Sequence, residues 1–280
     1  MWQKSYDNNP ILYLIPTPIG NMEDITLRAL NVLRDVEVIF SEDTRVTSLL
    51  LKHYDIKSRL ICLEDHNEHL VKEKVLEYLK NGHNVAIVTD RGTPIISDPG
   101  YKTVKYVSDM GYNVVSLPGA TAFIPALTVS ALAPLPFIFY GFLDSKESKR
   151  SKQLEKLKNI EYTIVFYEAP HRIIKTLNDM LEIFGNRNIS ISREISKKFE
   201  SIYRGTIKDV LNDFDNIKGE FVIVVEGCKK INEDNNINYL ELIDLKVNEG
   251  NSISNAIKLV AKEYNLNKND LYNKYHGGKK

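Results

Sequence analysis

The chain has 280 residues, of which 43% are hydrophobic and 26% are charged, as is typical of a globular protein with one large or two ordinary α/β domains. Its 37 Lys and Arg residues balance its 37 Asp and Glu residues, so an anionic partner would have to be bound by local patches. Cys62 and Cys228 lack metal-site spacing, and no apolar run is long enough to form a signal core or to span a bilayer. We therefore expect a cytoplasmic protein.

Short apolar segments that alternate with amphipathic ones predict a first α/β lobe over residues 1–118. We expect its strands at 11–15, 36–40, 60–63, 85–89 and 113–117, with helices between them, one of which covers 101–110. In open α/β sheets, ligands bind outside the carboxyl ends of the strands. The residues that follow each strand are therefore the first candidates for a functional site.

The strand over 85–89 is followed by an irregular loop that runs to Gly100 and contains two prolines and two glycines. Asp90 and Asp98 supply carboxylates there, and Gly92 would let a ligand approach the main chain closely. This pattern favours a ligand-binding loop over the alternative, an ordinary strand-to-helix turn with an Asp cap.

Two further Pro/Gly turns follow strands, PTPIGN at 16–21 and PGATA at 118–122. Neither has the Gly-x-Gly-x-x-Gly spacing of a dinucleotide-binding loop, so a Rossmann site is not expected. Turns of this kind on neighbouring strands can build a cleft for a small ligand. The segment SEDTR at 41–45 either begins a capped helix with an exposed salt bridge or faces the same cleft as Asp90. The segment EDHNE at 64–68 is typical of a polar helix start, because no second His or Cys lies at metal-ligand spacing.

A second α/β lobe is predicted over residues 119–230. It contains an apolar helix at 123–131, helices at 173–184 and 207–214, and strands at 162–167, 189–192 and 221–225. A lysine-rich run over 144–158 is typical of a solvated linker and helix face, and a role in phosphate contact is the alternative. Two α/β lobes joined by a linker usually bind their ligand between them.

Residues 231–280 form a different kind of segment. An Asn/Asp-rich spacer over 232–238 precedes a pattern of three short helices over 239–275, for which Leu266, Leu271 and Tyr272 would close a small core. The pattern fits a helix-turn-helix, and it fits equally a helical cap that packs on the second lobe or on a partner subunit.

Seven motifs occur in one order along the chain: LYLIPTPIGN, DITLRAL, SEDTR, GTPIISDPGY, LPGATA, FYEAPHR and YRGT. Together they resemble the ribosomal RNA small-subunit methyltransferase I family, a branch of the tetrapyrrole methylase superfamily, over residues 12–227. The resemblance implies two α/β lobes of the tetrapyrrole methylase type with a cleft between them, S-adenosylmethionine as cofactor, no metal, and a homodimer. It also implies that the substrate is small-subunit rRNA in the 30S subunit, methylated on the ribose 2′-hydroxyl of one cytidine in the decoding region.

The resemblance also implies which positions meet the cofactor. They are Pro16, Ile19, Gly20, Asp90, Gly92, Thr93, Ile95, Thr121, Ala122, Tyr167 and Glu220. One position departs from the family's usual pattern, because Arg91 replaces an alanine beside the expected cofactor site. Arg91 would add a phosphate contact if it points outward, and would obstruct the site or pair with Asp90 if it points inward.

Methyl transfer to a ribose hydroxyl needs positioning and a nearby proton acceptor. We expect these roles from polar residues at strand ends: Asp43, Arg45, Glu168 and His171 as catalytic groups, with Glu168 and His171 as proton acceptors, and Arg172 and Arg193 as RNA contacts. Lys149 and Arg150, from the lysine-rich run, are further expected RNA contacts. A local ion pair or a helix cap is the alternative role for Glu168 and His171. Two other functions stay open, a small-molecule methyltransferase of the same fold and a non-catalytic ribosome-binding protein.

Overall fold

The computed structural model describes residues 2–213, 218–229, 238–264 and 266–277. Contacts between residues divide the chain into two units, Met1–Cys228 and Lys229–Lys280. The first unit contains two sheets, each with its own helices, and the second is wholly helical. None of the described helices combines the length and the apolarity that crossing a membrane requires.

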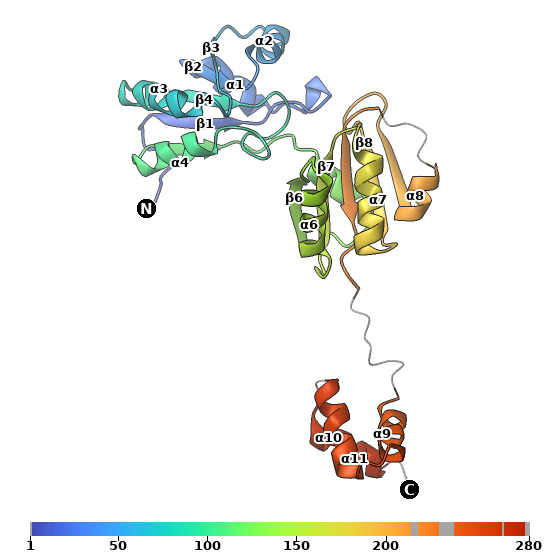
Figure 1. Cartoon of the computed structure of the whole chain (residues 1–280). Coiled ribbons are helices and arrows are strands. Elements are labelled where there is room, and N and C mark those ends of the chain that lie inside the picture. Colours follow the sequence, from blue (N-terminus) through green and yellow to red (C-terminus); the bar gives the residue numbers. More distant parts are fainter. Residues whose placement is uncertain (1, 214–217, 230–237, 265, 278–280) are drawn as a thin grey trace. The chain divides into compact units, whose positions relative to one another are not determined.

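The first sheet is parallel throughout, with the strand order β3-β2-β4-β1-β5. Its strands are β1 (Ile11–Ile15), β2 (Val38–Ser41), β3 (Arg59–Cys62), β4 (Val85–Val88) and β5 (Asn113–Ser116). Between them lie a short 3-10 helix, η1 (Met22–Asp24), and the helices α1 (Leu27–Asp35), α2 (Thr44–His53), α3 (Glu68–Lys80) and α4 (Tyr101–Asp109) (Figure 1). We call this sheet and its helices the first lobe.

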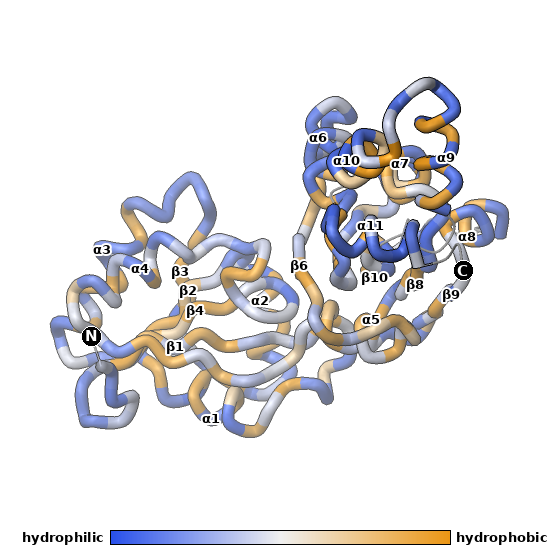
Figure 2. The backbone as a smooth tube through the Cα atoms, turned by 90° about the horizontal axis from the view of Figure 1, so that it is seen from below, coloured by the Kyte–Doolittle hydropathy of each residue, from blue (hydrophilic) through white to orange (hydrophobic). Residues whose placement is uncertain are grey.

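Helices cover both faces of the first sheet. Tyr13 and Ile15 on β1 pack with Leu33 of α1, whereas Leu12 and Leu14 face the opposite way and pack with Val75 of α3. Successive side chains of a strand point to opposite faces, so a strand that is buried on both sides must be apolar throughout. The central strands of this sheet are accordingly hydrophobic along their length (Figure 2).

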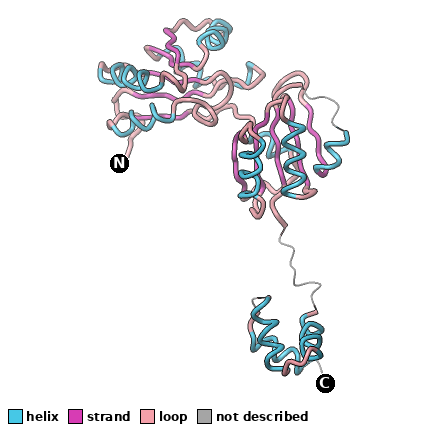
Figure 3. Tube along the Cα trace, in the orientation of Figure 1, coloured by secondary structure: helices cyan, strands magenta, loops and turns pink. Residues whose placement is uncertain are grey.

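The second sheet is mixed, with the strand order β6-β7-β10-β8-β9. Figure 3 shows the strands in magenta and the helices beside them in cyan. Its elements are α5 (Phe123–Val129), β6 (Phe137–Phe142), α6 (Glu147–Leu157), β7 (Thr163–Glu168), α7 (Ile173–Phe184), β8 (Asn188–Arg193), β9 (Ser201–Thr206), α8 (Ile207–Asp213) and β10 (Phe221–Val225). We call them the second lobe. Helices α6, α7 and α8 pack on one face of the sheet, and α5 packs on the other. The boundary expected at residue 118 stays a prediction.

Two strands of the second lobe were not expected. The segment 200–206, interpreted as merely polar, contains the edge strand β9, whose residues are only partly buried. The apolar residues 137–142 form the other edge strand, β6, which is parallel to β7 and shifts register between Phe139 and Gly141. Repetition of the first lobe's alternation would have made this sheet parallel, but β10 pairs antiparallel with both β7 and β8.

The second unit folds around its own small core. Its helices are α9 (Tyr239–Asn248), α10 (Ile253–Glu263), which Ser252 caps, and α11 (Lys268–Gly277). Ile243, Ile257 and Leu271 are buried at its centre. Leu266 packs against this core as expected, but Tyr272 was wrongly expected to, since it is 45% exposed and Tyr275 is buried instead. The expected spacer lies almost wholly outside the described residues.

Candidate functional site

Three loops meet at the carboxyl edge of the first sheet. Because β1 pairs with β4, the loops that follow them are neighbours, and Thr17 and Gly92 exchange two backbone hydrogen bonds of 2.9 and 3.0 Å. The turn after β5 packs against the turn after β1 so closely that a Cβ on Gly119 would lie 2.6 Å from the Pro16 Cβ. Pro16 therefore braces this edge of the sheet.

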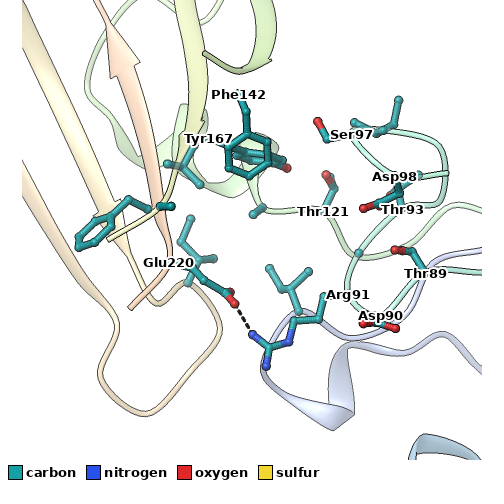
Figure 4. A pocket seen from close by; sticks show the side chains of 18 of the residues that line it. Thr89, Asp90, Arg91, Thr93, Ser97, Asp98, Thr121, Phe142, Tyr167 and Glu220 are labelled. Carbon is teal, nitrogen blue, oxygen red and sulfur yellow. Dashed lines mark hydrogen bonds and ion pairs between the residues drawn. The ribbon is translucent and has the colours of Figure 1, made fainter. Parts of the chain in front are cut away.

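A cavity of about 540 Å³ opens at this edge and takes its walls from both lobes. Figure 4 shows Thr89, Asp90, Thr93 and Asp98 on one side of it and Tyr167 and Glu220 on the other. Apolar side chains, among them those of Ile19, Ala122, Phe142, Ile195 and Val222, also line it. A mostly apolar cavity of this size with a few polar groups is typical of a site for a small ligand or cofactor.

The loop after β4 reaches the cavity through an unusual backbone. Ile95 and Ser97 both adopt a positive φ, 77° and 71°, which non-glycine residues rarely do and which is costly for a β-branched residue. As a result Ile95 packs against the core of the first lobe, whereas Ile96, Ser97 and Asp98 line the cavity. The Ile95 side chain therefore does not line the cavity, and the expected contact of its backbone with the cofactor stays a prediction.

The first-lobe wall of the cavity is acidic. Burial raises the pKa of Asp98 to about 6. A hydrogen bond with Thr89 lowers this pKa, and the nearby carboxylates of Glu42 and Asp90 raise it further. Burial also raises the pKa of Asp90, although the Asp43 N–H that donates to its Oδ1 at 3.0 Å opposes the shift. Negative charge at this wall favours a cationic ligand group.

A hydrogen-bonded layer supports this wall from behind. The Thr89 hydroxyl donates to Glu42 Oε2 at 2.8 Å, and the side chain of Asp43 caps α2 by accepting the Arg45 N–H at 2.8 Å. The Arg45 side chain bonds to the same carboxylate and lowers the pKa of Asp43 to about 2. Neither Asp43 nor Arg45 lines the cavity, so Asp43 acts on it only through Asp90.

An ion-pair chain crosses from one lobe to the other at the rim of the cavity. Arg91 pairs with Glu220 (Figure 4). Glu220 also accepts from Lys197 Nζ at 2.9 Å, and Lys197 in turn pairs with Glu194 at 2.8 Å. Beside this chain, the Ser196 hydroxyl donates to Asp24 of the first lobe. Arg91 thus neither fills the cavity nor pairs with Asp90, and its partner lies in the second lobe.

A second cavity, of about 470 Å³, lies next to the first. It extends along the first lobe to Thr17, Gly20 and α2, and the two cavities share Val46, Thr89, Asp90 and Arg91. Molecules bound in the two cavities would therefore lie on either side of one short stretch of chain.

The residues expected to hold the cofactor mostly lie together. Eight of them line the first cavity: Ile19, Asp90, Gly92, Thr93, Thr121, Ala122, Tyr167 and Glu220. Gly20 instead lines the neighbouring cavity, and Pro16 is buried beneath the edge of the sheet. The aromatic ring of Tyr167 packs edge-on against Phe139, and burial raises the pKa of its hydroxyl.

Two of the expected catalytic and RNA-contacting residues have structural roles. The Glu168 side chain is 1% exposed, and its carboxylate accepts from Arg172 Nε at 2.8 Å, from Thr176 Oγ1 at 2.6 Å and from the Ala169 N–H at 2.8 Å. Arg172 also donates to the Leu143 carbonyl. The expectations of proton acceptance by Glu168 and phosphate contact by Arg172 are corrected, because these groups are occupied by each other.

The remaining expected RNA contacts differ in accessibility. Arg150 is 3% exposed and pairs with Asp179 inside the second lobe, so its expected RNA contact is also corrected. Lys149 is exposed beside Asp144, Arg193 donates to the Lys218 carbonyl, and His171 is exposed at the start of α7. Among the described residues, no three His, Cys, Asp or Glu side chains gather as a metal ion would need.

Some lining residues were not among the expected site residues. Phe142 and Ser97 enter the cavity from a strand edge and from a strained turn, and neither position has a sequence signal. Glu42 and Asp98 also line the cavity, and their positions did have a sequence signal, since each follows a predicted strand and carries a carboxylate.

Comparison with protein families and with curated relatives shows which proteins the chain is similar to. The model of the tetrapyrrole (corrin/porphyrin) methylases matches residues 11–211. Curated relatives named ribosomal RNA small subunit methyltransferase I include one from Bacillus subtilis, 44% identical with 95% of this chain and 94% of the relative covered. Another, from Haemophilus influenzae, is 42% identical with 95% and 96% covered.

Solved structures agree on the fold. A uroporphyrin-III-C-methyltransferase from Thermus thermophilus superposes with a TM-score of 0.56 and 18% identity over 78% of this chain and 94% of its own. At this identity the likeness concerns the fold alone.

Methyltransferases of this family use S-adenosylmethionine, and the first cavity fits that cofactor. Tyr167 and Val222 offer apolar surface to an adenosine, and the carboxylates of Asp90 and Asp98 would complement a sulfonium. The match over almost the whole of each sequence shows that the chain belongs to the ribosomal RNA small subunit methyltransferase I family of tetrapyrrole methylases, whose cofactor is S-adenosylmethionine.

Proposed function

We propose that this protein methylates the ribose 2′-hydroxyl of a cytidine in the decoding region of small-subunit rRNA. The observation that carries the proposal is the 44% identity, over nearly the full length of both chains, with a relative named for methylation of small-subunit rRNA. We propose a cytidine as the target nucleotide and its 2′-oxygen as the methyl acceptor because the seven motifs resemble that family. The 30S subunit is the proposed substrate, the cytoplasm the proposed location and a homodimer the proposed assembly.

The arrangement of the two cavities supports group transfer. When bound in the first cavity, S-adenosylmethionine supplies an activated methyl group that needs no covalent help from the protein. The chain must then hold the acceptor oxygen in line with that methyl group and exclude water. A nucleotide in the second cavity would approach across the shared wall at Thr89, Asp90 and Arg91. We propose Ile19, Thr93, Thr121 and the other lining residues of the expected set as cofactor contacts.

The RNA backbone requires cations outside the cavities. Lys149 and Arg193 remain our proposed phosphate contacts, and the Arg45 side chain, 87% exposed near the shared wall, joins them. Removing one phosphate contact should weaken RNA binding most at low salt, where such contacts count most.

The direct test is methyl transfer in vitro. The purified protein is incubated with S-adenosylmethionine labelled in its methyl group and with 30S subunits that lack the modification, and ribose methylation is then mapped along the rRNA. One methylated cytidine in the decoding region supports the proposal. Label transferred to a base or to another site would contradict it. Transfer to uroporphyrin instead would favour a small-molecule methyltransferase, and cofactor binding without any transfer would favour a ribosome-binding role.

A further inference from the structure

A ribose hydroxyl must lose its proton when its oxygen is methylated, so the site needs a proton acceptor. Five carboxylates line the first cavity: Glu42, Asp90, Asp98, Glu168 and Glu220. Two of them already pair with cations, because Glu168 binds Arg172 and Glu220 binds both Arg91 and Lys197. Both carboxylates already have cationic partners in the structure.

Of the other three carboxylates, those of Glu42 and Asp98 share the Thr89 hydroxyl. This hydroxyl donates to Glu42 Oε2 at 2.8 Å and is also a hydrogen-bond partner of Asp98. Glu42 accepts a further, longer hydrogen bond from the Asp90 N–H, and Asp90 accepts the Asp43 N–H. One hydroxyl hydrogen cannot serve Glu42 and Asp98 at once, so this pair is short of one donor. A proton taken up by Asp98 would supply it.

We infer that Asp98 is the catalytic residue that accepts the proton of the acceptor hydroxyl, and that Thr89 and Glu42 are positioning residues that hold its carboxylate. Asp98 lines the first cavity and not the second, opposite Tyr167, and it reaches the wall that the two cavities share through its contact with Thr89 (Figure 4). This inference rests on the proposed function, because it takes a ribose hydroxyl as the acceptor.

The methyl transfer needs no reactant besides the hydroxyl, the methyl donor and these side chains. The acceptor oxygen uses a lone pair to form a bond with the methyl carbon, and the carbon–sulfur bond breaks with its electron pair going to the sulfur. The hydroxyl proton passes to Asp98, which then donates a hydrogen bond to Thr89 Oγ1 while the Thr89 hydroxyl continues to donate to Glu42. Release of the proton to water restores the carboxylate.

The electrostatics of the wall suit this role. Burial raises the pKa of Asp98 to about 6, so the group is ionised at neutral pH and yet more basic than an ordinary aspartate. Within the described residues, no Lys, Arg or His side chain forms an ion pair with Asp98. The charged or titratable groups that line its cavity are Glu42, Asp90, Arg91, Tyr167, Glu168 and Glu220.

The first test compares methyl transfer to 30S subunits by the wild type and by Asp98→Asn, with Asp109→Asn on the surface of α4 as the matched control. Loss of general-base catalysis should lower kcat roughly 100-fold or more in Asp98→Asn and leave Asp109→Asn at the wild-type rate. The wild-type rate should rise with pH through an apparent pKa near or below 6, and Asp98→Asn should lack this rise.

The positioning residue is tested by Thr89→Val, which has nearly the same shape but no hydroxyl, and by Thr89→Ser, which keeps it. Thr89→Val should displace the pH profile, and Thr89→Ser should restore it. A purely structural role of Thr89 would change cofactor affinity or stability and leave the profile where it is.

A readout without RNA separates this inference from the proposed function. Calorimetry should show that the wild type binds S-adenosylmethionine more tightly as the pH rises from 5 to 7, because ionised Asp98 attracts the sulfonium, and that Asp98→Asn lacks this dependence. If the wild type methylates rRNA and Asp98→Asn does so at the same rate, the inference fails and the proposed function stands. If the wild type transfers nothing to rRNA, the proposed function fails, and a pH-independent affinity would remove Asp98 from the site as well.

Discussion

Replacement of Glu168 by alanine would remove the carboxylate on which the start of α7 depends. Glu168 and Arg172 are 1% and 16% exposed at their side chains, and the carboxylate accepts hydrogen bonds from Arg172, Thr176 and Ala169. Removing one partner of such a pair leaves the other charge buried and unpaired, which costs about 3–5 kcal/mol. In a domain of this size each kcal/mol lowers Tm by roughly 2–4 °C, so we expect a fall of roughly 6–20 °C.

Thermal unfolding followed by circular dichroism measures this shift. The matched control is Glu155→Ala, because Glu155 pairs with Lys158 at 3.7 Å with both side chains about half exposed, and such a pair contributes about 1 kcal/mol at most. A double variant, Glu168→Leu with Arg172→Leu, should lose less than the two single changes together, since it leaves no unpaired charge. If Glu168→Ala shifts Tm no more than Glu155→Ala does, the structural role assigned to this pair is refuted.

Four other outcomes are expected. Arg91→Ala should lower the free energy of unfolding by less than about 1 kcal/mol, since Arg91 and Glu220 are both more than half exposed, and a larger loss in urea unfolding would contradict a surface pair. Gly141→Ala should destabilise by about 1 kcal/mol or more, because Gly141 has a φ of +81° and a new Cβ would lie 3.2 Å from Ser97 Oγ; equal Tm values would disprove this. Asp98→Asn should be more stable than the wild type above pH 6, by roughly 1–2 kcal/mol after screening, and as stable as the wild type near pH 4. The pKa of Asp98 is raised in the folded state, so the protonated group stabilises the folded wild type below the pKa of the unfolded state. This stabilisation is lost as the pH rises through about 6. Ile257→Ala should cost the second unit about 2–5 kcal/mol and leave amide exchange in the first unit unchanged, which hydrogen exchange resolved by segment can check.

Much of the fold follows from local patterns. The strand β1, the helix α7 and the strand β10 begin and end where the apolar periodicity predicts, because each is buried by residues that repeat at the spacing of its own element. Strand β9 escaped prediction because an edge strand is only half buried and its polar residues resemble a loop. The antiparallel course of β10 has no signature in its sequence, since a fully buried strand is apolar in either direction.

The site was predictable to the extent that it depends on strand ends. Asp90 and Gly92 were expected from the loop that carries them, Thr121 was implied by the family resemblance, and all three line the cavity. The partner of Arg91 was not predictable, because Glu220 lies 129 residues further along the chain and in the other lobe. The roles of Glu168 and Arg172 were misjudged for a different reason. Their spacing of four residues fits a local ion pair as well as a polar site, and only burial distinguishes the two.

The lobes of the first unit are joined at the cavity rim by the carboxylate of Glu220, which attracts both Arg91 and Lys197. Arg91 and Glu220 are more than half exposed, and dissolved salt weakens attraction between exposed charges, with a Debye length of about 8 Å at physiological ionic strength. Ionic strength should therefore act twice on this protein, by weakening the hold on RNA phosphates and by weakening the contact between the two lobes beside the cofactor cavity. Measurements of RNA affinity against salt would contain both effects, and cofactor release rates measured without RNA would isolate the second.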